Sequence, residues 1–107
     1  MLGLNQSIVS ARVSRTMGVS LAAAGKPEEA ASDLDAAGAA FQRAAPATKP
    51  VAVTALLRAR ELAATNRTAE ALASCHDAFA LLASLKAGIE PALVTPCLNA
   101  YYAEAGR

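Results

Sequence analysis

Residues 17–30 read MGVSLAAAGKPEEA, and residues 58–71 read RARELAATNRTAEA. When the two stretches are aligned, small, large and acidic residues fall at the same positions, 41 residues apart. The matched pairs are Gly18 and Ala59, Leu21 and Leu62, Gly25 and Asn66, Glu29 and Glu70, Ala30 and Ala71, Leu34 and Cys75, and Ala37 and Ala78. The chain therefore carries an internal repeat, the mark of a fold built from stacked copies of one supersecondary unit.

The residue types in the repeat are those that a pair of antiparallel helices joined by a tight turn requires. Two helices cross closely only where the side chains between them are small. Gly18 and Ala30 are the small residues of the first copy, and Ala59 and Ala71 those of the second. One such hairpin cannot bury its faces alone, so the next must stack on it.

Turn signals divide the chain into five predicted helices. Gly25 and Asn66 suit the left-handed residue just past a helix end, and Pro27 suits the first turn of the helix that follows. Thr68 is a candidate N-cap, and Pro96 either kinks the last helix or begins it. The predicted helices cover residues 6–24, 27–44, 50–65, 68–86 and 92–105.

The composition agrees with closely packed helices. Of 107 residues 29 are alanine, the best helix former and a poor strand former, and only 4% are aromatic. This excludes an all-β fold and a disordered chain. A net charge of +1 excludes the electrostatic field that nucleic acids or anionic membranes require, and no apolar run is long enough to cross a membrane.

At these residues the chain resembles the tetratricopeptide repeat. The first copy matches the family pattern at Met17, Gly18, Leu21, Gly25, Glu29, Ala30, Leu34 and Ala37. The second departs at Arg58 and Asn66, and a third, partial copy keeps Leu98, Tyr102 and Gly106. The resemblance implies one all-α domain over residues 1–107, folded as a short right-handed solenoid of antiparallel hairpins. Its repeats would span residues 8–45 and 50–86, followed by a partial repeat or capping helix at 91–107.

The period of 41 exceeds the family's usual 34 and is similar to the long-helix variant of kinesin light chains and of bacterial regulators. The excess of alanine, arginine, glycine and valine is typical of a GC-rich bacterial genome. In the family, peptides lie in the groove lined by the first helix of each pair. Carried over, the candidate groove residues here are Arg12, Arg15, Val19, Val53, Leu56 and Arg60. The three arginines would attract an acidic segment.

Two functions follow from this resemblance. The first is a non-enzymatic scaffold that binds a protein or peptide, a neighbouring domain or a second copy of itself as a homodimer. The second is a regulatory or sensor segment of a bacterial transcriptional regulator or signalling protein, which predicts that the chain is a fragment of a longer protein. Both place the chain in the cytoplasm, away from membranes and without direct contact to nucleic acid.

Catalytic and metal chemistry have little support in the sequence. Cys75, His76 and Asp77 are adjacent, and adjacent helical residues point about 100° apart, so their side chains cannot converge. His76 is the single histidine, and Cys97 is too far along the chain to form a recognised zinc motif. We expect no enzyme activity, no cofactor and no metal, and we expect both cysteines to be free thiols in a reducing compartment.

Overall fold

The computed structural model describes residues 2–106, with side chains from residue 8 onward, and it contains helices and no strand over that range. The helices are α1 (Leu2–Ala23), α2 (Pro27–Ala44), α3 (Lys49–Ala64), α4 (Thr68–Ser84) and α5 (Pro91–Ala105). The all-α prediction with five helices is confirmed, although α1 begins earlier than expected. Of the two alternatives for Pro96, the start of the last helix is excluded, because α5 begins at Pro91, one residue before the predicted start, and contains Pro96.

The tight turns after α1 and α3 have the same hydrogen bonds, 41 residues apart. Gly25 and Asn66 both adopt the left-handed conformation that the sequence predicts, with φ of 78° and 66°. Around them the amide nitrogens of Gly25, Lys26, Asn66 and Arg67 donate to the carbonyl oxygens of Ala22, Leu21, Ala63 and Leu62, respectively. These two bonds per turn form a Schellman motif, which ends a helix and reverses the chain.

The first hairpin closes on a glycine. A Cβ atom placed on Gly18 would lie 2.7 Å from Leu34 Cγ, which is too close without a shift of that side chain, and 3.3 Å from the carbonyl oxygen of Ala30, a tight contact. Leu34 and Ala30 are fully buried on α2. The prediction that a small residue is needed where α1 crosses α2 is therefore confirmed.

The second hairpin and α5 share most of the core. Ala59 of α3 and Ala71 of α4 are buried in one cluster, together with Leu62, as the repeat predicts. The other members of this cluster are Ala31, Ala52, Leu56, Cys75, Ala78, Leu82, Cys97 and Ala100. Six of these eight are alanines or cysteines with short side chains, so the helices approach closely and enclose little volume.

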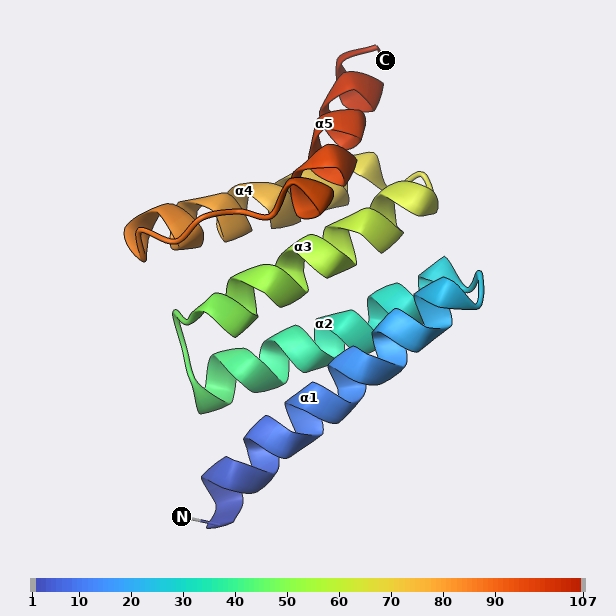
Figure 1. Ribbon diagram of the computed structural model, residues 1–107. Helices are drawn as coiled ribbons and strands as arrows, with labels where there is room; N and C mark the ends of the chain where they lie inside the picture. The colour runs from blue at the N-terminus through green and yellow to red at the C-terminus, as the bar shows by residue number, and fades with distance from the viewer. Residues whose placement is uncertain (1, 107) are drawn as a thin grey trace.

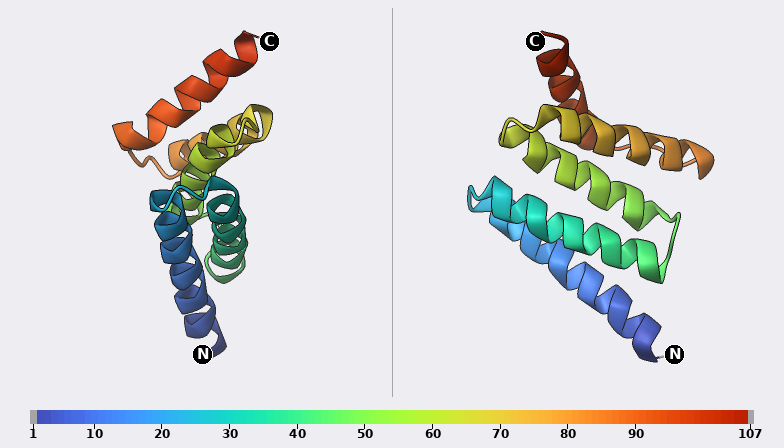
Figure 2. Two further views of the ribbon diagram at one scale, coloured as in Figure 1. Left: turned by 90° about the vertical axis from the view of Figure 1, so that its right-hand side faces the viewer. Right: turned by 180° about the vertical axis from the view of Figure 1, so that it is seen from behind.

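Successive helices are neighbours in space. The chain zigzags from α1 to α4 as a row of antiparallel helices, and α5 lies across α3 and α4 at the far end of the row (Figure 1). Seen from the side, the row is thin, and the described residues span 49 × 33 × 19 Å (Figure 2). None of the described helices is long and apolar enough to cross a membrane.

The expectation of free thiols is wrong. Cys75 and Cys97 form a disulfide that joins α4 to α5, with their Cα atoms 6.1 Å apart. The two cysteines are 22 residues apart in sequence, and they meet because α5 folds back across α4. Both are buried, so the bond belongs to the core.

A second link between α4 and α5 corrects the assignment of Thr68. Thr68 is the first residue of α4, and Arg67 is the N-cap residue of that helix. No side-chain hydrogen bond caps the helix. The Thr68 hydroxyl instead donates a hydrogen bond to the Glu104 carboxylate on α5. Thr68 thereby helps to hold α5 in place rather than to start its own helix.

Candidate groove between α2 and α4

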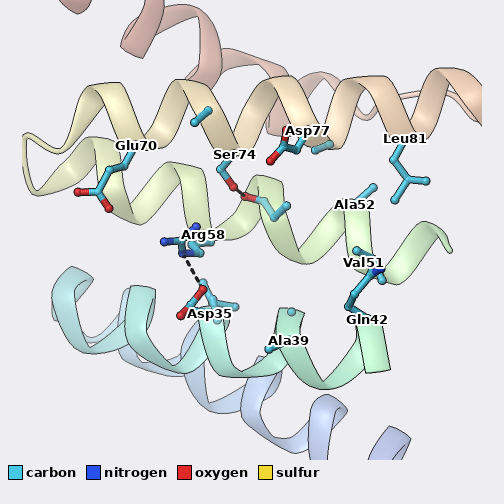
Figure 3. Close-up of a pocket in the computed structure, with 15 residues that line it drawn as sticks. Asp35, Ala39, Gln42, Val51, Ala52, Arg58, Glu70, Ser74, Asp77 and Leu81 are labelled. Atoms are coloured by element: carbon cyan, nitrogen blue, oxygen red, sulfur yellow. Dashed lines mark hydrogen bonds and ion pairs between the residues drawn. The ribbon is translucent and has the colours of Figure 1, made fainter. Parts of the chain in front are cut away.

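A groove of about 590 Å³ runs between α2 and α4, with α3 as its floor (Figure 3). No contact joins α2 to α4 within residues 2–106, so the two helices stand apart on either side of α3. The lining residues are Leu34, Asp35, Gly38, Ala39 and Gln42 of α2, Val51, Ala52, Ala55 and Arg58 of α3, and Glu70, Ala73, Ser74, Asp77, Ala78 and Leu81 of α4.

The helical period explains why these residues share one surface. Residues three and four apart lie on the same face of a helix. On α4 the spacing from Glu70 through Ser74 and Asp77 to Leu81 follows this rule, and α2 presents a shorter stripe from Asp35 to Gln42. Most residues between the charged ones are glycine or alanine, so the surface is smooth and close to the backbone.

A hydrogen bond between α3 and α4 fixes the position of α4 at one side of the groove. Ser74 is buried, and its hydroxyl donates to the carbonyl oxygen of Ala55 at 2.8 Å. This bond satisfies a polar group that would otherwise be costly to bury. It also holds the α4 wall at a defined position on the floor.

The charged residues of the groove are mostly acidic. Asp35, Glu70 and Asp77 line it, against one arginine, Arg58. Arg58 Nε lies 3.5 Å from Asp35 Oδ1, an ion pair that joins α3 to α2 and leaves the Asp35 side chain 70% exposed (Figure 3). Asp77 is exposed and has no ion-pair partner among the described residues.

Glu70 is held in its charged form by a neighbour outside the groove. Arg67 Nη2 donates to Glu70 Oε2 at 2.7 Å, and a second bond runs from Arg67 Nε to Glu70 Oε1 at 3.0 Å. This paired hydrogen bonding lowers the pKa of the Glu70 carboxyl below its ordinary value and raises that of Arg67. The carboxylate therefore stays negative over the whole neutral range.

The candidate residues on α1 lie away from this groove. Arg12 is exposed beside a shallow hollow that Val9, Val13 and Met17 share. The Arg15 guanidinium carbon lies 5.1 Å from the centre of the Phe41 ring, a cation–π contact within the first hairpin. Val19 is exposed on α1 and lines no part of the groove.

The candidate residues on α3 are also dispersed. Leu56 is 1% exposed and belongs to the core, so it offers a partner no surface. Val53 and Leu56 do lie together, because both line a small hollow next to the segment before α5. Arg60 Nε donates to Glu61 Oε2 at 2.7 Å, which neutralises its charge locally. The six candidate residues are thus not brought together on one surface.

Some of the residues that form the groove could have been identified from the sequence, although the internal repeat does not indicate them. Asp35 and Asp77 are exposed positions that the repeat does not align, and the buried Ser74 lies between them in the groove. A stripe of alanine, serine and aspartate at helical spacing on α4 could have indicated a second, solvent-facing contact surface. Its partner stripe on α2 becomes visible only once both helices flank α3.

No arrangement for covalent or metal chemistry is found in the described part of the chain. Cys75 is in the disulfide, His76 lines a small apolar hollow beside it, and Asp77 lies in the groove, so the three side chains diverge. Within residues 2–106 no three histidine, cysteine, aspartate or glutamate side chains are grouped so that they could hold a metal ion.

No protein-family model, no curated protein and no solved structure matches the chain.

Proposed function

We propose that the chain is a non-enzymatic interaction module of tetratricopeptide type, a short stack of helix hairpins that binds a peptide segment of another protein. Two features support the hairpin repeat. The turns after α1 and α3 have equivalent hydrogen bonds at equivalent positions, and both hairpins carry buried alanines at the positions that the repeat aligns. Packing of α2 against α3 stacks one hairpin on the next.

The groove between α2 and α4 is the observation that carries the proposal. Its floor is of small apolar residues, and its rim carries exposed polar groups, a combination typical of recognition sites for peptides and amphipathic helices. The proposed binding surface therefore lies on α2 and α4, the second helices of the two hairpins, with α3 between them. On the face of the first helices, carried over from the family, Leu56 is buried and Arg15 and Arg60 contact other side chains of the chain.

A bulky neutral substitution in the groove tests this function. Ala73 is exposed on α4 and lines the groove, whereas Ala36 is equally exposed on α2 and lies outside it. Peptides of 16 residues are selected from a random phage-displayed library on the wild-type chain, and their affinities are then measured for Ala73→Trp and Ala36→Trp. We expect binding to Ala73→Trp to be at least tenfold weaker, about 1.4 kcal/mol, and binding to Ala36→Trp to be unchanged.

Two results would contradict the proposal. One is a selection from which no peptide binds above background. The other is a set of peptides that bind Ala73→Trp as tightly as the wild type. Matching circular dichroism spectra and melting temperatures of the two variants are the control for folding.

The disulfide bears on the compartment in which the chain works. Disulfides persist in oxidising compartments and are rare in the reducing cytosol. The Cys75–Cys97 bond therefore supports an oxidising compartment over the cytoplasm predicted from the sequence. Alkylation of the denatured chain taken directly from its native cells, without reductant, is expected to label neither cysteine; labelling of both would favour the cytoplasm.

A further inference from the structure

We propose that the segment bound in the groove is a positively charged amphipathic helix, with a lysine or arginine on the edge of its apolar face that pairs with Asp77. This inference rests on the proposed function and adds the chemistry of the partner. It reverses the acidic partner expected from the arginines of α1 and α3.

The sign of the partner's charge follows from the charges that remain unsatisfied. Three carboxylates and one guanidinium line the groove, and Arg67, outside the groove, is bonded to one of these carboxylates, Glu70. Arg58 is paired with Asp35 inside the groove, which leaves Asp77 as an exposed carboxylate with no ion-pair partner among the described residues. A bound cation would pair with Asp77, whereas a bound anion would be repelled.

The arginines expected to recruit an acidic segment are engaged elsewhere. Arg15 lies over the Phe41 ring, and Arg60 is bonded to Glu61. Arg12 is exposed but lies on α1, away from the groove. An acidic segment would therefore meet single, separated positive charges rather than a continuous surface.

The position of the partner's basic residue follows from α4. Asp77 lies on the groove face of α4, between Ser74 and Leu81. Glu70 lies on the same face but is already paired with Arg67 through two hydrogen bonds. The unsatisfied charge therefore requires one basic residue on the partner, opposite Asp77.

A helix fits this surface because the chain already packs helices on small residues. At Gly18 the backbone of α1 approaches α2 until no Cβ fits. The groove offers similar positions at Gly38, Ala39, Ala55 and Ala73, where an incoming helix meets little side chain. Helices packed in this way have axes about 8–10 Å apart, and the separation of α2 from α4 leaves α3 accessible to such an approach.

The peptides recovered from the random library test the inference directly. We expect them to be rich in lysine and arginine, with a basic residue at the edge of a face of apolar or small residues. Asp77→Asn should weaken their binding about two- to five-fold and Asp77→Lys about five- to twenty-fold, since exposed ion pairs are modest. Glu29→Lys changes the net charge of the chain as much as Asp77→Lys does. Glu29 is exposed and lies outside the groove, so this control substitution should change affinity less than two-fold.

Helical binding is tested with the same peptides. A proline placed in the middle of a recovered peptide breaks a helix but is tolerated by an extended segment. We expect this change to abolish measurable binding, and a peptide that binds equally well with the proline would overturn the helical part of the inference.

The outcomes separate the inference from the proposed function. Acidic or neutral peptides that lose affinity for Ala73→Trp would overturn the charge inference and leave the groove as the binding site. Basic peptides that bind Asp77→Lys and Glu29→Lys equally would overturn it as well. Peptides that bind Ala73→Trp as tightly as the wild type would contradict both the charge inference and the proposed function.

Discussion

Two glycines within helices offer a matched test of how closely the helices pack. Gly18 lies inside α1 and Gly38 inside α2, and each can be replaced with alanine. The intrinsic helix preference favours alanine by about 1 kcal/mol at both positions. The two substitutions therefore differ only in what the added methyl group meets.

The structure predicts different changes in the free energy of unfolding for the two substitutions. At Gly18 the added Cβ lies 2.7 Å from Leu34 Cγ and 2.9 Å from Leu34 Cδ2. Leu34 is fully buried and cannot move away freely, so overpacking of about 1–3 kcal/mol outweighs or cancels the helix preference. At Gly38 the nearest atom is Thr54 Cγ2 at 3.7 Å, an ordinary contact.

We expect Gly38→Ala to stabilise the chain by about 1 kcal/mol, which raises the melting temperature by about 4–8 °C. Gly18→Ala should leave stability unchanged or lower it by up to about 2 kcal/mol. Urea and thermal unfolding followed by circular dichroism measure both. If Gly18→Ala stabilises the chain as much as Gly38→Ala does, α1 does not approach α2 at this residue and the hairpin geometry is incorrect.

Three further substitutions test the core, the crosslink and the surface of the second hairpin. Thr54 is fully buried and its hydroxyl has no hydrogen-bond partner, so Thr54→Val should stabilise the chain by about 1 kcal/mol in urea unfolding; a loss of stability would show that the hydroxyl is bonded. Replacing both Cys75 and Cys97 with alanine opens a loop of 22 residues and should lower the free energy of unfolding by about 3 kcal/mol, whereas no difference from the wild type under non-reducing conditions would contradict the crosslink. The pKa of Glu70 is lowered in the folded chain by the hydrogen bond from Arg67, so its stabilising effect is present above the ordinary carboxyl pKa of 4.5 and is lost as the pH falls through the lowered value. The melting temperatures of wild type and Glu70→Gln should therefore differ most at neutral pH and converge in acid; a constant difference across this range would contradict the pairing.

The parts of the fold that local residues determine were predictable. Gly25 and Asn66 end their helices because few other residues adopt a positive φ without strain, and that preference can be recognised from the sequence alone. Lys86 shows the limit of this rule, since it adopts a φ of 54° without being glycine or asparagine. The helix that the sequence predicts to end at residue 86 therefore ends two residues earlier, at Ser84.

The features that depend on distant contacts were not predictable from the repeat. The disulfide forms because α5 crosses α4, and nothing near Cys75 or Cys97 in the sequence indicates that crossing. Thr68 has the composition of an N-cap, yet its hydroxyl is drawn to Glu104 across the interface with α5. The groove likewise depends on α2 and α4 flanking α3 without touching each other.

The binding groove is the central claim, and amide chemical-shift mapping tests it most directly. The isotope-labelled chain is titrated with the tightest peptide recovered from the library, and the shifted amides are assigned. Shifts confined to the groove faces of α2, α3 and α4, centred on Ala73 and Asp77, are the predicted result. Shifts centred on Arg12, Arg15 and Val19 of α1, with the groove unchanged, would contradict it.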